Sequence, residues 1–488
     1  MSYDLYVDLR AIQRYIFSSN KLRDNLGASY LVSHIFDDFK DENTGFCGGG
    51  NLYRQCDNEI RAKEIVRDLS RAIFETAPGL SFNAAIVKTK ENEDFSSRIK
   101  RLHQKLEEEK QNHQQITTLR SYGVNAQCSS GPLSAQYQDP FEKDKYISEV
   151  VYAKRKLFKN DKENDKEVDT ISDEYSQYLS DDFKLTEEFL EISPLKGEDS
   201  HIAVVHIDGN GIGAIFSTLK TLSDYQEFSK KLNTDMHKAL RETIKILEDK
   251  IRKGEWDYNY KPVNEQNTLK NILPLRPIYI GGDDITFVCE GKLGIVLACT
   301  YIEQIKKILN NKNITFCAGI AIAKTNFPFF QTYKAAEALC RSAKNKRMKE
   351  DEIESYIDFH MINSSIYSNL EEVRKIQYKS IDGINLLYRP YKIDDLKTQI
   401  ENAINFAKAW PNSKLAKFRE VLYKESSERR TFSRELKTRG DLELYCKGES
   451  FQDFQTSEDF TLGSKTIFLD IIELIDLLPE EKANEIPS

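Results

Sequence analysis

Residues 279–286 read Tyr-Ile-Gly-Gly-Asp-Asp-Ile-Thr, a short polar tip between strand-forming side chains. Glycine and aspartate favour tight turns, while tyrosine, isoleucine and threonine favour extended backbone, so this stretch predicts a β-hairpin. A surface hairpin without any chemical role uses the same residue types. The segments on either side of the hairpin therefore decide how its two aspartates are interpreted.

The segments around this hairpin form one unit of strands and helices. Upstream, residues 202–207 form an apolar, β-branched strand that ends in Asp208, and apolar residues then recur at helical spacing from 228 to 246. Downstream, an amphipathic stretch over 293–309 precedes another apolar strand over 314–320. The pattern predicts the order strand, helix, strand, strand, helix, strand, with the hairpin at its centre.

The first 90 residues repeat this order. The matching segments are a strand over 5–8, helical spacing over 17–31, a hairpin tip Gly48-Gly49-Gly50-Asn51, a helix over 60–74 and a strand over 80–86. The tip and the last strand are 31 residues apart in this copy (51 to 82) and 32 in the other (284 to 316). Two copies of the unit predict an α+β protein with two ferredoxin-like palm domains, each a sheet with helices packed on one face.

The two copies divide the chain into four predicted parts. They are a first, degenerate palm over 1–92, a helical and charged connector over 93–199, a second, catalytic palm over 200–365 and a helical C-terminal domain over 366–488. Within the connector, the Lys-, Asp- and Glu-rich run 154–174 predicts a solvated helix and a mobile segment. An insertion over 250–270 predicts a surface excursion of the second palm.

Composition limits the classes of function that the chain can serve. Its 488 residues contain 70 Lys and Arg against 78 Asp and Glu, so a net charge of −8 excludes a strong overall attraction for nucleic acid, and any such contact must be local. No apolar run approaches the roughly 18 residues of a membrane span. The first residues lack a secretory signal, and the eight cysteines contain no CxxC pair. These features predict a cytoplasmic protein whose cysteines are small core residues in a reducing compartment.

Three carboxylates are predicted to meet at one edge of the second sheet. Asp208 ends a strand, and Asp283 and Asp284 lie at the tip of the hairpin that this topology places beside it. Carboxylates suit Mg²⁺ or Mn²⁺, and two such ions about 3.5 to 4 Å apart can stabilise the attacking and leaving oxygens of a displacement at phosphorus. We therefore assign these three aspartates as candidate metal ligands and catalytic residues, and His206 as a strand histidine that faces the core.

Several nearby residues are candidates for binding a triphosphate. Gly281 and Gly282 let the backbone approach phosphate without a Cβ in the way, and Gly209-Asn210-Gly211 opens the next helix, where unpaired amides favour anions. A glycine-rich turn can equally be only a turn. Lys344, in an alanine-rich helix, is either a neutralising partner for the triphosphate or a solvated lysine favoured near a helix C-terminus.

The first copy differs from the second at the hairpin tip. Gly50 and Asn51 stand where the second copy has its two aspartates, and neither residue can replace an ionised ligand. The first palm should be catalytically silent, while Gly48, Gly49 and Asn51 remain candidates for holding a nucleotide. An active palm facing an inactive one suits the joining of two nucleotides in preset geometry, and because the pair is fused, a monomer can suffice.

Taken together, these motifs resemble the CRISPR polymerase family, which supplies the large subunit of type III CRISPR effector complexes. The stretches that carry the resemblance are Asp8–Phe17, Gly48–Asn51, Ile207–Gly213, Gly281–Asp284, Ala318–Ala321 and Ala343-Lys344. The resemblance implies that the second palm converts ATP to cyclic oligoadenylate or cyclic dinucleotide messengers in antiviral defence, with Mg²⁺ or Mn²⁺ and release of pyrophosphate. It gives the metal role to Asp208, Asp283 and Asp284.

The departures from this family shape the expected activity and partners. Larger members begin with a His-Asp nuclease domain and carry a four-cysteine zinc module between the palms, whereas this sequence starts at the first palm and keeps only Cys128 in that region. We expect no DNA cleavage. ATP is the expected substrate, and other type III subunits with guide and target RNA are possible partners, unless the enzyme acts alone. The alternative is a non-catalytic palm scaffold that binds nucleotide or RNA, which gives no physical reason for three mutually repelling carboxylates.

Overall fold

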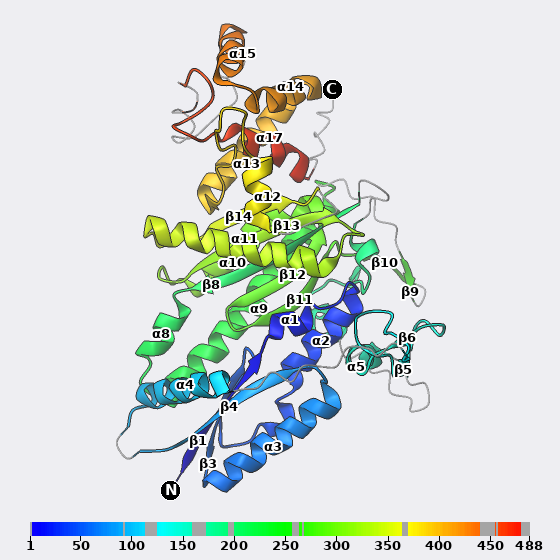
Figure 1. The fold of residues 1–488 in the computed structure, drawn as a ribbon, viewed down its shortest axis with the longest axis vertical. Helices are drawn as coiled ribbons and strands as arrows, with labels where there is room; N and C mark the ends of the chain where they lie inside the picture. Colours follow the sequence, from blue (N-terminus) through cyan, green and yellow to red (C-terminus); the bar gives the residue numbers. More distant parts are fainter. Residues whose placement is uncertain are drawn as a thin grey trace.

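The computed structural model describes most of the chain. The described residues are 2–90, 93–112, 124–158, 172–193, 200–255, 263–265, 268–363, 369–439, 454 and 457–479. Figure 1 shows two sheets stacked along the long axis, with the N-terminal sheet at the bottom and the C-terminal helices at the top. Among the described helices, none is both long enough and apolar enough to cross a bilayer.

The N-terminal sheet has the predicted palm topology. Its elements are β1 (Tyr3–Arg10), α1 (Ile12–Ile16), α2 (Leu22–His34), η1 (Asp37–Phe39), β2 (Thr44–Gly48), β3 (Asn51–Cys56), α3 (Glu59–Thr76), β4 (Ser81–Lys88) and α4 (Phe95–Asn112). The strand order is β2-β3-β1-β4, and β1 runs antiparallel to both of its neighbours. Leu5 and Val7 of β1 pack with α2 and α3 on one face, while Tyr6 packs with α4 on the other. Helix α4, which the sequence places in the connector, therefore covers the first palm.

The second sheet repeats this arrangement and extends it. Its elements are β8 (His201–Asn210), α8 (Ile212–Thr218), α9 (Leu222–Arg252), β11 (Leu275–Gly281), β12 (Asp284–Glu290), η4 (Gly291–Leu293), α10 (Gly294–Leu309), β13 (Thr315–Lys324), α11 (Phe329–Glu350) and β14 (Tyr356–Met361). The order β11-β12-β8-β13 matches that of the first sheet, and β14 and β15 (Tyr391–Lys392) add two strands at one edge. The two-palm, ferredoxin-like fold is confirmed.

Alternation along β8 explains how this sheet is covered. Ala203, Val205 and Ile207 face α9 and α10, whereas Ile202 and Val204 face the opposite side, where α11 lies. Because side chains alternate across a strand, His206 and Asp208 also face α11. The sheet is therefore buried on both faces, which is why β8 reads as a nearly continuous apolar run.

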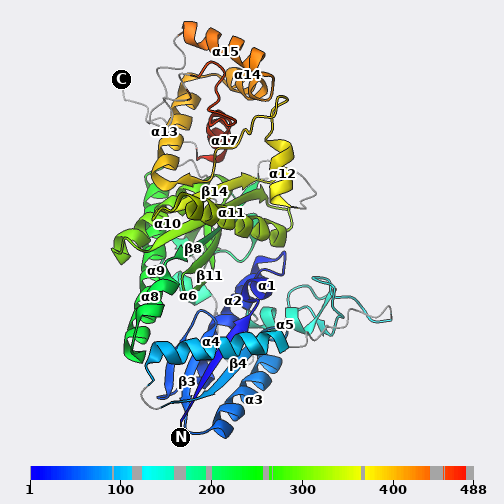
Figure 2. The ribbon, with the colours of Figure 1, turned by 60° about the vertical axis from the view of Figure 1, so that its left-hand side comes forward.

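The two palms pack against each other, and each contributes a helix whose aromatic residue stacks on the other palm. Phe17, at the end of α1, is fully buried and stacks on Tyr333 of α11 at a centroid distance of 3.7 Å. In the other direction, Tyr225 of α9 stacks on Phe46 of β2 at 4.6 Å. The palms thus share one continuous apolar core, and Figure 2 shows them in a single column.

The connector contains a structured module beside α2. Its described elements are β5 (Tyr137–Gln138), β6 (Tyr146–Ile147), α5 (Glu149–Arg155), η2 (Lys156–Phe158), α6 (Ser172–Ser176), β7 (Phe183–Lys184) and α7 (Phe189–Ile192). Figure 2 shows the segment around α5 projecting sideways from the stacked sheets. The insertion contributes β9 (Val263–Glu265) and β10 (Thr268–Ile272), which form a small sheet with β7, while residues 256–262 and 266–267 lie outside the described part.

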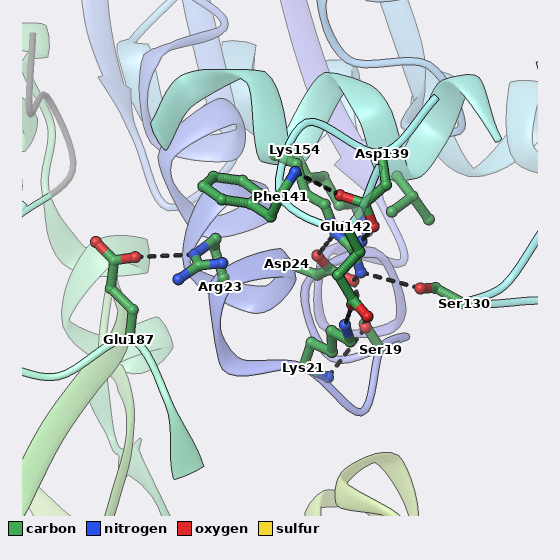
Figure 3. Close-up of polar contacts among 12 residues, drawn as sticks. Ser19, Lys21, Arg23, Asp24, Ser130, Asp139, Phe141, Glu142, Lys154 and Glu187 are labelled. Atoms are coloured by element: carbon green, nitrogen blue, oxygen red, sulfur yellow. Dashed lines mark hydrogen bonds and ion pairs between the residues drawn. The ribbon is translucent and has the colours of Figure 1, made fainter. Parts of the chain in front are cut away.

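The prediction of a solvated helix was wrong at its first two residues. Arg155 is 2% exposed and binds Asp24 of α2 through Nε at 2.6 Å, and it also pairs with Asp139, around which Figure 3 shows the polar contacts. Lys154 is buried as well, and its Nζ donates to the Tyr15 carbonyl at 2.8 Å. Burial lowers the pKa of Lys154 to about 8. Residues 159–171 of the charged run lie outside the described residues.

The last part of the chain is helical, as predicted. Its described elements are α12 (Leu370–Gln377), β15 (Tyr391–Lys392), α13 (Ile393–Ala409), α14 (Asn412–Leu422), α15 (Ser426–Arg439) and α17 (Phe468–Leu477). An ion pair between Arg374 of α12 and the buried Asp358 of β14, at 2.8 Å, ties it to the second palm. Within this part, Asp470 accepts from the backbone amide of Arg389 at 2.9 Å and from Tyr391 Oη at 2.7 Å. The domain boundaries given above stay a prediction.

Candidate active site

The three aspartates of the second palm lie together at one edge of the sheet. Asp208 of β8 is directly opposite Asp284 of β12 in the strand register, and the turn before β12 carries Asp283. Carboxylate oxygens of all three lie within 4.8 Å of one another. Oxygen ligands at this spacing fit a hard divalent cation such as Mg²⁺, which commonly takes one or two carboxylates and completes its coordination with water and substrate oxygens.

Tight turns hold the carboxylates in place. Gly282 has a φ of +65°, a backbone conformation that favours glycine. A Cβ at Gly281 would lie 2.0 Å from Tyr279 Oη, and one at Gly209 would lie 2.8 Å from the Cβ of Asp283. Side chains at these glycines would therefore displace the hairpin that carries the two acids.

The carboxylates destabilise one another without a cation. Burial, followed by the charges of Asp208 and Asp283, raises the pKa of Asp284 well above its ordinary value. Burial and the charge of Asp208 raise the pKa of Asp283 to about 6. Desolvated acids that repel one another are the ligand set that a divalent cation stabilises, so the residues fit Mg²⁺ or Mn²⁺.

Lys344 belongs to this cluster. Its ammonium group pairs with Asp208, and its side chain is 29% exposed. Although burial pulls the pKa of Lys344 down, the hydrogen bond to Asp208 raises it above the ordinary value. Lys344 is therefore a charged group directed at the acidic site, and the alternative of a solvated lysine at a helix C-terminus does not describe its position.

These pKa shifts predict that metal binding depends on pH. The pKa of Asp283 is raised to about 6. Below that pH a proton on the Asp283 carboxylate competes with the cation, and above that pH the carboxylate is ionised and can bind the cation. The stabilisation that Mn²⁺ gives the protein should be weak near pH 5 and large near pH 7.5. Thermal melts with and without Mn²⁺ across this range measure it, and a metal-induced shift that does not grow with pH would contradict the assignment.

The remaining candidates divide into two groups. Gly211 caps α8 with a φ of +86°, but this helix has only seven residues, and Asn210 points its amide at Thr315 in the neighbouring strand, at 3.3 Å from the carbonyl. Neither observation supports the predicted phosphate contact by the 209–211 turn. Gly281, Gly282 and Lys344, in contrast, all lie around the three carboxylates.

The first palm has an aspartate and a lysine at the positions that correspond to Asp208 and Lys344. Asp8 is opposite Asn51 in the register, as Asp208 is opposite Asp284, and Lys110 pairs with Asp8 at 3.2 Å. Lys110 is the sixteenth residue of α4, and Lys344 is the sixteenth residue of α11. Sequence reasoning missed this pair, although the equal spacing from Phe95 and Phe329 could have revealed it.

The two hairpin tips face each other across the palms. A Cβ at Gly49, whose φ is +59°, would lie 3.5 Å from the backbone nitrogen of Gly282. Gly48 and Gly49 therefore lie beside the second palm's hairpin, and Asn51 donates to the Gly49 carbonyl at 3.3 Å. The hairpin tips of the two copies therefore approach each other at Gly49 and Gly282.

This contact predicts different outcomes for two neighbouring glycines. Gly49→Val should lower the free energy of unfolding by roughly 1–3 kcal/mol, because a β-branched residue is strained at positive φ, and the added atoms would push on the opposite hairpin. Gly48→Val is the matched control, since a Cβ there meets nothing within 4 Å. Urea denaturation measures both variants, and equal destabilisation would contradict the close approach of the tips.

Comparisons with known proteins agree with this geometry. Residues 201–353 match the family model described as Cas10/Cmr2, second palm domain. The Csm1-Csm4 cassette in complex with cA4 superposes with a TM-score of 0.54 at 12% identity, covering 97% of this chain and 70% of that one. Csm1 in T. onnurineus gives 0.56 at 14% identity, covering 97% and 69%. The cassette in complex with one ATP gives 0.56 at 12% identity, covering 98% and 70%.

At these identities the solved structures show a shared fold. A search of curated proteins found no match. The family model covers the segment that carries all three aspartates and Lys344, and the fold likeness extends over both palms. Residues 201–353 therefore form a second palm domain of the Cas10/Cmr2 type, within a chain that has the fold of Csm1.

Proposed function

We propose that the protein is a nucleotidyltransferase that converts ATP to cyclic oligoadenylate or cyclic dinucleotide messengers and releases pyrophosphate. The observation that carries the proposal is the meeting of Asp208, Asp283, Asp284 and Lys344 at one edge of the second palm. This edge faces the hairpin tip of the first palm. In this proposal the second palm would bind the nucleotide that supplies the activated phosphate, and the hairpin of the first palm would bind the other nucleotide.

The three carboxylates would hold divalent cations, which neutralise triphosphate charge and favour ionisation of an attacking 3′-hydroxyl group. Asp208 would leave its pair with Lys344 when it takes up this role. The freed ammonium group would then bind phosphate oxygens and stabilise the charge that develops on the leaving pyrophosphate. Gly281 and Gly282 would let a triphosphate approach the backbone between the two acids and the ammonium group.

The first palm would orient the second nucleotide. Gly48, Gly49 and Asn51 lie at the hairpin tip that abuts the second palm, and the Asp8–Lys110 pair lies beside them in the sheet. With one carboxylate neutralised by lysine, this copy can present polar groups to a nucleotide but lacks the acids for a cation. The first palm would hold this nucleotide in position, which lowers the entropic cost of bringing the two nucleotides together.

The ligands of similar solved structures support this proposal. These structures are Csm1-Csm4 cassettes in complex with ATP, AMPPNP, pppApA and cA4. By likeness of fold, we propose that this chain also works as a subunit of a type III CRISPR effector and contacts a Csm4-like partner together with guide and target RNA. The non-catalytic scaffold remains the alternative, and it predicts nucleotide binding without turnover.

The experiment that separates these possibilities is a product assay. Purified protein is incubated with ATP and Mn²⁺, alone and with its reconstituted effector subunits and target RNA, and the products are identified by mass spectrometry. We expect pyrophosphate together with linear and cyclic oligoadenylates. ATP that stays unchanged under all of these conditions would contradict the proposal and favour the scaffold.

A further inference from the structure

A second cluster of metal-binding side chains lies behind the three aspartates. His206 of β8, Asp208 of β8 and Cys340 of α11 place one ligand atom each within 4.8 Å of one another. His206 is 3% exposed and Cys340 is 2% exposed, whereas the Asp208 side chain is 25% exposed. The cluster is therefore a buried position that Asp208 connects to the acidic site.

The chemistry of this cluster differs from that of the acidic site. A thiolate, an imidazole and a carboxylate are ligands for Zn²⁺ or another thiophilic cation, whereas Mg²⁺ prefers oxygen ligands alone. The same aspartate thus lies between a position for hard cations and one for soft cations. Three protein ligands leave the fourth tetrahedral position open to water.

The surroundings of the cluster support ligation. His206 Nδ1 hydrogen-bonds Thr286 Oγ1 at 3.0 Å, which fixes the ring and leaves Nε2 for a cation. Tyr333 packs edge-on against the same ring at 5.8 Å and restricts its rotation further. The Cys340 thiol donates a hydrogen bond to the Cys317 carbonyl at 3.2 Å, which holds the sulfur in place on α11, and a bound cation would replace this proton.

We propose that His206, Asp208 and Cys340 form a site for a thiophilic divalent cation, Zn²⁺ in the first instance, and that its occupation inhibits the second palm. On binding, the Cys340 thiol releases its proton to solvent and its sulfur bonds to the cation. Asp208 turns from Lys344 and from the hard-cation position towards the soft one. The inhibition rests on the proposed function, whereas the binding does not.

Cobalt titration tests the binding directly. Metal-free protein is titrated with Co²⁺, which reports thiolate ligation through a charge-transfer band in the near ultraviolet. We expect the band to appear in the wild type, to be lost in Cys340→Ala, and to be displaced by Zn²⁺. Cys299→Ala is the matched control, because Cys299 is a buried cysteine of a different helix, α10, and its loss should leave the band intact. A band that persists in Cys340→Ala, or that never forms in the wild type, would overturn the site.

Two further measurements test metal binding and inhibition of the second palm separately. His206→Asn should weaken Co²⁺ binding by at least about tenfold, since even partners of metal ligands contribute that much. In the product assay with Mn²⁺, traces of Zn²⁺ should inhibit the wild type, and Cys340→Ser should retain synthesis and resist the inhibition. Equal inhibition of both proteins would overturn the regulatory role. If no protein makes product under any condition, the proposed function fails, while the cobalt titration still decides whether the site exists.

Discussion

Replacing Asp283 and Asp284 together by asparagine should abolish product formation while making the metal-free protein more stable. Activity should fall by about 10³-fold or more, because charge stabilisation by bound cations supplies several kcal/mol of transition-state energy. Stability should rise at pH 7, since burial and mutual repulsion raise the pKa of both acids and so disfavour their ionised forms in the folded state. The product assay and thermal melts measure the two effects.

The matched control is Asp37→Asn with Asp38→Asn, an exposed pair of adjacent aspartates in η1. This double variant removes the same charge and should change neither activity nor stability appreciably. Mn²⁺ should raise the melting temperature of the control but not that of the Asp283 and Asp284 variant. A double variant of the hairpin that still forms product would rule out its carboxylates as catalytic groups.

Phe17→Ala should cause the largest loss of stability among the substitutions considered. Phe17 is fully buried and stacks on Tyr333 of the other palm. Its ring centroid also lies 6.3 Å from the ring centroid of Phe329. Truncation of a buried phenylalanine costs about 3–5 kcal/mol. Because the lost ring joins the palms, activity should fall even under conditions in which the variant remains folded. Urea denaturation gives the stability, and product formation at low temperature gives the activity.

Phe74→Ala is the control for this substitution. Phe74 lies on α3 with 72% of its surface exposed, so the same truncation should leave both the free energy of unfolding and the activity close to wild type. If Phe17→Ala were as mild as Phe74→Ala, the two palms would not depend on this packing. A variant that is destabilised but keeps its full activity per folded molecule would show that the palms do not need this alignment for catalysis.

The fold was predictable because local pattern and topology agree. The apolar run before Asp208, the helical spacing after it and the Gly-Gly-Asp-Asp tip define the second palm, and the same order of elements in the first 90 residues defines the first palm. The meeting of Asp208 with Asp284 also followed, since the burial pattern of the two adjacent strands and the hairpin turn limit the register in which they can pair.

What the sequence could not provide were contacts between distant elements. Lys154 and Arg155 begin a charged run, and only the position of α2 shows that they are buried against Asp24 and the Tyr15 carbonyl. Charge patterns alone favour a solvated helix, because most such runs are solvated. Likewise, the approach of Cys340 to His206 depends on how α11 crosses the sheet, which residue periodicity does not determine.

The most direct test of the central claim is a crystal structure of the protein with Mn²⁺ and a non-hydrolysable ATP analogue, in which anomalous scattering locates the ions. The account predicts Mn²⁺ among the carboxylates of Asp208, Asp283 and Asp284, with triphosphate oxygens completing its coordination. Ions bound elsewhere, with these three carboxylates free of metal and nucleotide, would contradict it.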